Sequence, residues 1–324
     1  MKERQVFCTP EEVFLTTGAQ QAMTLLTKLL ASEGESILVD QLTYPGFIQI
    51  AQAMHLKLIP TPVCFQRGIQ TKDLRRLLEN NPRPSLMYTM SEGHNPLGIN
   101  LSKEQRVELT KLALEYKVPI IEDDAYGFLN YDPVDPPLKS YGKDGVFYIG
   151  SFSKILAPSL RVGWIIASPS MIEKLEILKE SLDINTSTLS QALIHSFFAR
   201  GILTEHISKL KETYKAKRDV MAHSLRKYIP EMEFTIPKSG FFIWGKLPSS
   251  INTKRLFKLA LEEEKVSFLP GNAFLIGTRE DIQNCLRLSF AFCPIETIEL
   301  GIKRLSMAIK GYKWKNEDQY LKVV

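Results

Sequence analysis

Short apolar runs and amphipathic stretches alternate along the first half of the chain. The apolar runs have the length of buried strands, and they lie at residues 13–16, 37–39, 56–60, 85–89, 118–122 and 146–149. Helical patterns separate them and begin at Gly18, after Tyr44-Pro45-Gly46, at Thr71 as N-cap, and at Ser102 in a capping box with Gln105. This alternation predicts an α/β fold with a mostly parallel central sheet and helices on both faces.

Polar residues follow these strands. Gly18, Tyr44, Asn95, Asp123 and Ser151 each come at or just after the end of a predicted strand. The carboxyl ends of parallel strands meet at one edge of a sheet, where such folds bind their ligands. We therefore expect a ligand site built from these positions.

The pattern changes after a strand at 162–167. Helices are predicted at 171–182, 189–199 and 203–228, followed by strands and helices at 241–244, 253–264, 266–269, 286–290 and 295–309. This predicts a large ligand-binding domain over residues 1–200 and a small C-terminal α+β domain over 201–324, which includes the long connecting helix. The basic and aromatic tail at 310–324 is predicted to be a surface extension.

Composition narrows the functional classes. The chain has 324 residues, 44% hydrophobic and 24% charged, which is typical of a globular protein and argues against disorder. The net charge of +5 is spread along the chain, so we expect no nucleic-acid partner. No apolar run is long enough for a membrane span and no signal peptide is expected, so we expect no membrane partner.

The cysteines and histidines give no sign of a metal site or a disulfide framework. Cys8, Cys64, Cys285 and Cys293 lie far apart without CxxC spacing, and the histidines have no metal-ligand spacing. This pattern fits a reducing compartment, so we expect a cytoplasmic protein without a metal.

One polar cluster indicates a specific chemistry. Ser151-Phe152-Ser153-Lys154 follows a strand, and Arg161 lies seven residues beyond the lysine. A lysine amine can form a Schiff base with an aldehyde cofactor, while hydroxyls and a guanidinium hold its phosphate. Ser-x-Ser-Lys alone is a weak signal, because lysines after serines are common on solvated loops.

Further motifs occur in a fixed order along the chain. They are Gly18-Ala19-Gln20-Gln21-Ala22, Tyr44-Pro45-Gly46, His94-Asn95-Pro96-Leu97-Gly98, Asp123-Asp124-Ala125-Tyr126, the Lys154 cluster, Arg161-Val162-Gly163-Trp164 and Leu286-Arg287-Leu288-Ser289-Phe290. In the order and spacing of these motifs, the chain resembles the class I and II aminotransferases. The resemblance runs from about residue 13 to about residue 309. These are pyridoxal 5'-phosphate (PLP) enzymes of fold type I. The branch it resembles contains aminoadipate and kynurenine aminotransferases and the effector domains of MocR-type regulators.

The resemblance implies roles for the residues that match. Lys154 would hold PLP as a Schiff base and move the substrate's α-proton, and Asp123 would face the pyridine nitrogen. Tyr126 and Asn95 would bind the phenolic oxygen of the cofactor, with Asn95 in a cis peptide before Pro96 and also beside the substrate. Tyr44 would stack on the ring, although Tyr-Pro-Gly also suits a plain turn. Asp124 suits an N-cap or a solvated acid and is given no chemistry.

The remaining roles concern anions. The phosphate would be held by the N-terminus of the first helix and by the residues after the strand near Lys154: Gly18, Ala19, Gln20, Ser151, Ser153 and Arg161. Arg287 would bind the α-carboxylate of the substrate, although a structural salt bridge would also explain an arginine in an apolar run.

The chain departs from the family pattern at two points. Only residues 1–12 precede the first predicted strand, where the family usually has several dozen more residues. Leu97 also stands where threonine is usual. We expect an aminotransferase acting on an α-amino acid and a 2-oxo acid, and a homodimer. Other PLP reactions (β-elimination, cyclisation or oxidation), a MocR-type effector domain and a non-catalytic binding protein are the alternatives.

Overall fold

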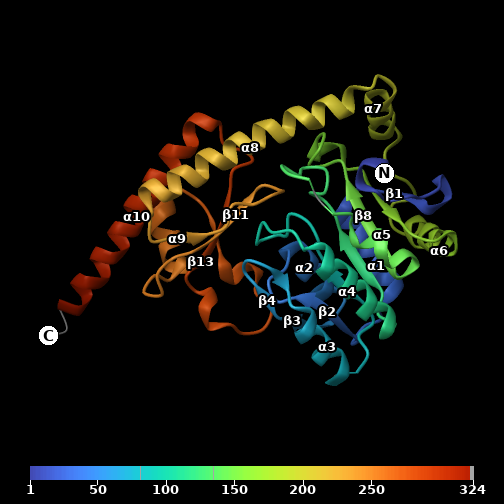
Figure 1. The fold of residues 1–324 in the computed structure, drawn as a ribbon, viewed down its shortest axis with the longest axis horizontal. Coiled ribbons are helices and arrows are strands. Elements are labelled where there is room, and N and C mark those ends of the chain that lie inside the picture. Colours follow the sequence, from blue (N-terminus) through green and yellow to red (C-terminus); the bar gives the residue numbers. More distant parts are fainter. Residues whose placement is uncertain (81, 134, 322–324) are drawn as a thin grey trace.

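The computed structural model describes residues 1–80, 82–133 and 135–321. Its larger sheet has seven strands (Figure 1). In spatial order they are β1 (Val13–Thr16), β9 (Gly163–Ile166), β8 (Val146–Ser151), β7 (Ile120–Asp123), β6 (Met87–Thr89), β2 (Ser36–Asp40) and β3 (Lys57–Thr61). β9 runs antiparallel to both neighbours, and the other pairings are parallel. The prediction of a mostly parallel sheet is confirmed.

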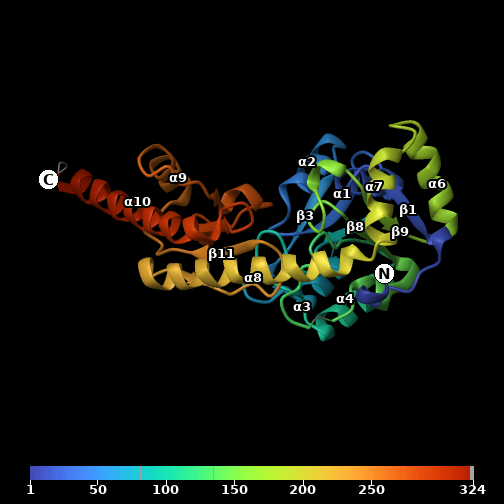
Figure 2. The same ribbon diagram turned by 90° about the horizontal axis from the view of Figure 1, so that it is seen from above.

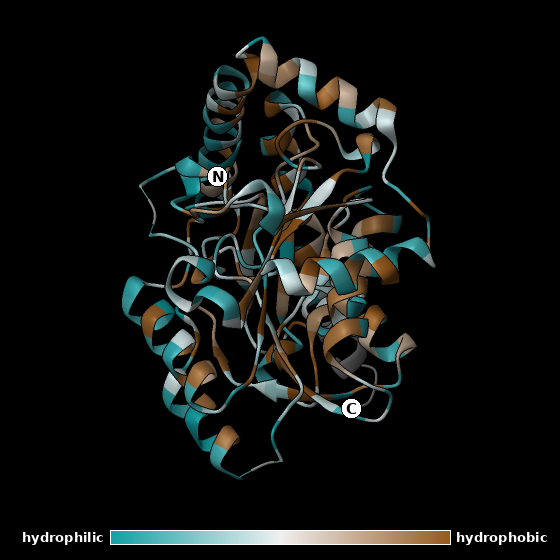
Figure 3. Cartoon of the chain, turned by 90° about the vertical axis from the view of Figure 1, so that its right-hand side faces the viewer, coloured by the Kyte–Doolittle hydropathy of each residue, from teal (hydrophilic) through white to brown (hydrophobic). Residues whose placement is uncertain are grey.

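Helices cover both faces of this sheet. They are α1 (Ala19–Leu30), α2 (Pro45–Ala53), α3 (Thr71–Asn80), α4 (Lys103–Glu115), α5 (Leu138–Gly142) and α6 (Pro169–Glu180), and a small hairpin adds β4 (Val63–Cys64) and β5 (Gly68–Ile69). Successive strand residues point to opposite faces. Ile121 therefore packs in one core with α1, and Ile120 packs in another with α3 and α4. In Figure 3 the central strands are mostly hydrophobic and the outer helices carry the hydrophilic positions.

The second sheet is antiparallel. Its order is β10 (Glu233–Phe234), β11 (Phe242–Lys246), β13 (Cys285–Ser289) and β12 (Leu269–Pro270). It packs with α9 (Thr253–Glu262) and α10 (Ile295–Leu321) around a core that includes Ile243, Leu256, Leu286 and Leu305. In Figures 1 and 2, α8 (Ile202–Tyr228) follows α7 (Thr188–Ala199) and runs beside α10.

The domain boundary at residue 200 stays a prediction. The first turns of α8 contribute Ile207 to a core of the large sheet, whereas Met221 and Leu225 near its end belong to the core of the small sheet. α8 therefore packs with both parts of the molecule.

Two details of the sequence prediction were wrong. α10 does not end near residue 309 but continues to Leu321, so the tail that was predicted to be a surface extension continues this helix over the described residues. Tyr312 is buried, and its hydroxyl accepts a hydrogen bond from the Asn252 N–H at 3.2 Å. Residues 322–324 lie outside the described part. Thr71 is the first helical residue of α3 and not its N-cap.

The topology places the polar residues at one edge of the large sheet. β1, β2, β6, β7 and β8 run in the same direction, so their carboxyl ends share that edge. Asp123 pairs with Ile149 across β7 and β8, two residues before Ser151. No helix of the described residues is long and apolar enough to cross a membrane.

The capping box predicted for α4 is present. Ser102 accepts a hydrogen bond from the Gln105 N–H, and the Gln105 side chain accepts one from the Ser102 N–H. We predict that Ser102→Ala lowers the free energy of unfolding by roughly 1 kcal/mol in urea titrations. Ser168 is a matched control, because it stands at the N-cap of α6 without a capping hydrogen bond. Equal losses in the two variants would contradict the assignment.

Candidate active site

A cavity of about 340 Å³ lies at the carboxyl edge of the large sheet. Most of the predicted site residues line it: Ala19, Gln20, Tyr44, Asn95, Asp123, Tyr126, Ser151, Ser153, Lys154 and Arg161. Gly18 and Arg287 do not line it but contact residues that do. The structure therefore gathers side chains from five strand ends in one place.

Asp123 is a buried acid that faces this cavity. It ends β7, and its carboxylate accepts hydrogen bonds from the Tyr88 hydroxyl at 2.9 Å and from the Ala125 N–H at 3.2 Å. Burial raises the pKa of Asp123 to about 6, while both hydrogen bonds oppose that rise. The carboxyl is therefore largely ionised at neutral pH. None of the ion pairs among the described residues gives it a cation.

Lys154 follows β8 and is partly buried in the same cavity. Burial lowers the pKa of its amine, and Asp123 opposes the shift. Within residues 1–80, 82–133 and 135–321, the Nζ atom has no hydrogen-bond or ion-pair partner. A lowered pKa increases the neutral fraction of the amine, which is the nucleophilic form.

Arg161 lies against the N-terminus of α1. A Cβ atom on Gly18 would stand 2.5 Å from Arg161 Nη2, so only glycine leaves room for the guanidinium there. The first-turn N–H groups of Ala19 and Gln20 have no intrahelical acceptor. Arg161 donates only long hydrogen bonds, to Ser153 at 3.4 Å, Pro158 at 3.4 Å and Thr17 at 3.5 Å. Helix N–H groups and an arginine without an anionic partner in the described chain form a basic cup.

Tyr44 forms the N-cap of α2, and its ring lies over Gly46. A Cβ atom on Gly46 would overlap with that ring, so the glycine makes room for it. The ring is partly buried beside Asp123, and burial followed by the Asp123 charge raises the pKa of its hydroxyl. An aromatic face is thus available in the cavity.

Asn95 and Tyr126 lie on the loops that follow β6 and β7. The Asn95–Pro96 peptide bond is cis, as expected. Tyr126 packs edge-on against Phe241 and Phe242, and Gly93 makes room for it, since a Cβ atom there would stand 2.7 Å from Tyr126 Cβ. Both residues are almost fully buried, which fixes their polar atoms at the cavity.

Arg287 comes from β13 in the second sheet and reaches the first. Its Nη1 donates to Asn95 Oδ1 at 2.6 Å, and its guanidinium stacks 3.8 Å from the ring centre of Phe242. Its Nε atom is buried without a partner in the described chain, and none of the described ion pairs involves it. The alternative of a structural salt bridge therefore finds no support. Burial lowers the pKa of Arg287 to about 10, so it remains charged at neutral pH.

The expectation for Asp124 was wrong. It is neither an N-cap nor solvated but is buried, at 2% exposure, and pairs with Arg4. The sequence could not indicate this contact, because the two residues are 120 positions apart.

Sequence reasoning also missed Tyr88, which donates to Asp123, and several apolar residues that line the cavity: Met23, Met90, Ala125 and Pro158. Tyr88 stacks on Phe47, with ring centres 3.7 Å apart. Strand alternation places Tyr88 and Asp123 on the same face of neighbouring strands. That was the one available signal for this contact.

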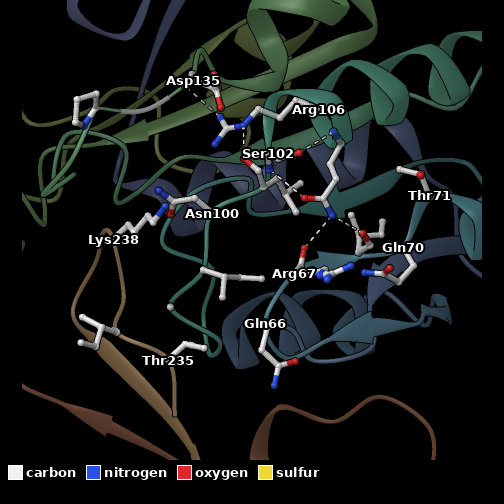
Figure 4. Close-up of a pocket in the computed structure, with 17 residues that line it drawn as sticks. Gln66, Arg67, Gln70, Thr71, Asn100, Ser102, Arg106, Asp135, Thr235 and Lys238 are labelled. Atoms are coloured by element: carbon white, nitrogen blue, oxygen red, sulfur yellow. Dashed lines mark hydrogen bonds between the residues drawn. The ribbon is translucent and has the colours of Figure 1, made fainter. Parts of the chain in front are cut away.

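A larger cleft of about 720 Å³ holds none of the predicted site residues (Figure 4). It lies along the segment 98–102 that follows the Asn95 loop, and its polar groups are largely bonded to one another. Gln105 donates to the Arg67 and Ile69 carbonyls, and Arg106 donates to the Leu101 and Pro136 carbonyls. We therefore place the chemistry in the smaller cavity. No cluster of acidic, histidine or cysteine side chains in the described chain is arranged to hold a metal ion.

Comparison with known proteins agrees with this geometry. Residues 2–305 match the family model of aminotransferase class I and II. The aromatic-amino-acid aminotransferase 1 of Thermococcus litoralis is 35% identical over 318 residues, which cover 96% of this chain and 75% of that protein. The HTH-type transcriptional regulator YdfD of Bacillus subtilis is 33% identical over 303 residues, covering 92% of this chain and 61% of the regulator.

Solved structures show the same fold. The α-aminoadipate aminotransferase LysN of Thermus thermophilus, complexed with N-(5'-phosphopyridoxyl)-L-leucine, superimposes with a TM-score of 0.88 at 33% identity. The match covers 96% of this chain and 80% of LysN. The predictions of fold type I and of an enzyme related to aminoadipate aminotransferases are confirmed. The chain belongs to the class I and II aminotransferase family.

Proposed function

We propose that this chain is a PLP-dependent aminotransferase that moves an amino group between an α-amino acid and a 2-oxo acid. The observation that carries the proposal is the composition of the cavity. A buried carboxylate, an amine of lowered pKa and a basic cup at a helix N-terminus share a volume of about 340 Å³.

These residues fit the functional groups of PLP. Arg161, the Ala19 and Gln20 N–H groups and the hydroxyls of Ser151 and Ser153 suit a phosphate, and Gly18 keeps the cup open. Asp123 suits a protonated ring nitrogen, and the Tyr44 ring suits a planar heterocycle. Asn95 and Tyr126 supply polar atoms for a ring oxygen. These residues therefore suit the phosphate, the ring nitrogen and the ring oxygen of PLP.

When bound, PLP supplies an aldehyde for attachment to an amine and a ring that withdraws electrons from the substrate's α-carbon. The protein supplies the acid–base chemistry. Lys154 Nζ, with its lowered pKa, would act as the general base that takes the proton from the substrate's α-carbon and then as the general acid that gives it back. The Asp123 carboxylate would stabilise a positive charge on the ring nitrogen of PLP. The apolar residues Met23 and Met90 exclude water from the reacting atoms.

Arg287 selects the substrate class. Its partly buried guanidinium has no anion among the described residues, and a substrate carboxylate would supply one. Its hydrogen bond to Asn95 Oδ1 and its stacking on Phe242 hold the guanidinium in place. We infer a substrate with a free α-carboxylate, in line with the amino-acid substrates in the names of the related enzymes.

We also propose a homodimer. Helix α7 exposes Leu189 at 71% and Phe198 at 55%, and Ile194 is its buried residue in the described structure. A helix with so much exposed apolar surface is typical of a subunit interface.

Similarity to transcriptional regulators supports a second candidate, a sensor domain that binds the cofactor and an amino acid without turnover. Other PLP reactions use the same core residues and stay open as well. Turnover separates an enzyme from the sensor, and recovery of the cofactor's absorbance band by a 2-oxo acid separates transamination from the other PLP reactions.

The test is a half-reaction. We expect the protein with PLP to show an absorbance band that a suitable amino acid bleaches and a 2-oxo acid restores. Lys154→Ala should lower the rate of this cycle by roughly a hundredfold or more, because the acid–base group is lost. A band that no amino acid bleaches would overturn the aminotransferase proposal, and a band that an amino acid shifts without bleaching would favour the sensor.

Arg287→Ala should weaken amino-acid binding by roughly a hundredfold, because a carboxylate would lose a buried charged partner. PLP affinity, measured by fluorescence titration, should change little. Arg279→Ala is a matched control, because Arg279 also stacks on an aromatic ring, that of Phe65, but pairs with Asp281 at 2.5 Å. Equal losses of amino-acid and PLP affinity in Arg287→Ala would contradict its role.

A further inference from the structure

A buried cluster of charges lies behind the cavity, on the face of the sheet opposite Asp123. Its carboxylates belong to Glu92, Glu122 and Asp124, and its guanidinium groups belong to Arg4 and Arg106. Strand alternation explains the arrangement, since Glu122 and Asp124 flank Asp123 and point away from it. The cluster therefore borders the cavity residues without lining the cavity.

Arg4 connects two loops of the active site. Its Nε atom donates to Asp124 Oδ2 at 3.0 Å, and its Nη2 atom lies 2.9 Å from the same oxygen and 2.5 Å from Glu92 Oε2. The Nη2 contacts are ion pairs rather than aligned hydrogen bonds. Glu92 lies three residues before Asn95, and Asp124 lies between Asp123 and Tyr126. One guanidinium thus joins the two loops that carry the expected ring contacts.

The charges of the cluster depend on this arginine. Burial and then Asp124 raise the pKa of Glu92, while Arg4 and Arg106 oppose that rise. Burial disfavours a charged Arg4, but Asp124 and then Glu92 raise its pKa above the ordinary value. Arg4 is only 4% exposed. Removing it would leave a buried carboxylate, Asp124, without a cation among the described residues.

The fit around Asp124 is tight. A Cβ atom on Gly127 would overlap with its carboxylate, and Tyr148 donates to Oδ2 at 2.6 Å. The Asp124 N–H donates to the Ile149 carbonyl at 2.9 Å, in the strand that leads to Lys154. A displaced Asp124 would therefore move the neighbouring Asp123.

We propose that Arg4 is a positioning residue that holds the Asn95 and Asp123 loops together, so that Asp123 meets the ring nitrogen of the cofactor. This inference rests on the cofactor role proposed for Asp123. Arg4 acts from outside the cavity, through Asp124 and Glu92, and touches neither cofactor nor substrate.

The test compares the affinity for PLP with that for 1-deazapyridoxal 5'-phosphate, in which a C–H group replaces the ring nitrogen. The ratio of the two affinities isolates the Asp123 contact. We expect the wild-type protein to prefer PLP, and Arg4→Gln to lower this preference roughly tenfold, since a charge-assisted hydrogen bond contributes at least that much. Circular dichroism and thermal unfolding confirm that each variant is folded.

Arg106→Gln is the matched control. Arg106 is equally buried and pairs with Glu92 at 3.2 Å, but its other hydrogen bonds go to backbone carbonyls and none goes to Asp124. Arg106→Gln should therefore leave the preference for PLP over 1-deazapyridoxal 5'-phosphate unchanged. If Arg4→Gln does not fold, Arg4→Lys takes its place, because one ammonium keeps the charge without bridging both acids, and an intermediate loss is expected.

An unchanged preference in a folded Arg4 variant would overturn the proposal, even if both affinities fell together, because that result would show a purely structural role. A wild-type protein that binds the two compounds equally would overturn the cofactor role of Asp123 and, with it, the role of Arg4. The two failures are therefore distinguishable.

Discussion

The site depends on two charged groups, Asp123 and Arg287, that have no ion pair among the described residues although burial shifts the pKa of each. Among the described residues, Asp123 has hydrogen-bond donors but no cation at ion-pair distance, and Arg287 has aromatic neighbours and an amide but no anion at that distance. Such groups are costly to bury, and a protein retains them where a ligand completes them. The protonated ring nitrogen of PLP would supply a cation for Asp123, and the substrate carboxylate would supply an anion for Arg287. The cluster around Arg4 is different, because two of its acids have cations inside the protein: Arg4 pairs with Glu92 and Asp124, and Arg106 pairs with Glu92. The third acid, Glu122, accepts hydrogen bonds from Ser91 and from the Leu138 and Lys139 N–H groups.

The two sheets contribute different residues to the candidate site. The large sheet supplies Asp123, Lys154 and the N-terminus of α1 from the carboxyl ends of strands that run in the same direction, and Arg161 from the segment before the antiparallel strand β9. The small sheet supplies Arg287, which crosses to Asn95. In the proposed function, cofactor binding would therefore draw on the large sheet, whereas substrate binding would need the two sheets to keep their relative position. Phe242 and Phe274, which both stack on Arg287, also come from the second part of the chain.

The sequence predicted those parts of the site that are built from short, contiguous motifs. Strand ends, the glycine of the α1 turn and the Lys154 cluster could be predicted, because each is a short motif whose position the parallel topology determines. Contacts between distant segments could not. Arg4 and Asp124 meet only through packing, and Asp124 carried no signal that would separate it from a solvated acid. The length of α10 was missed because its polar tail has no clear apolar period.

The central claim is that Lys154 is the residue that holds PLP. The most direct measurement is borohydride reduction of the protein with PLP, followed by peptide mass spectrometry. The account predicts the added mass of a reduced pyridoxyl-phosphate group on the peptide that contains Lys154. A label spread over other lysines, or no label on Lys154 at saturating PLP, would contradict it.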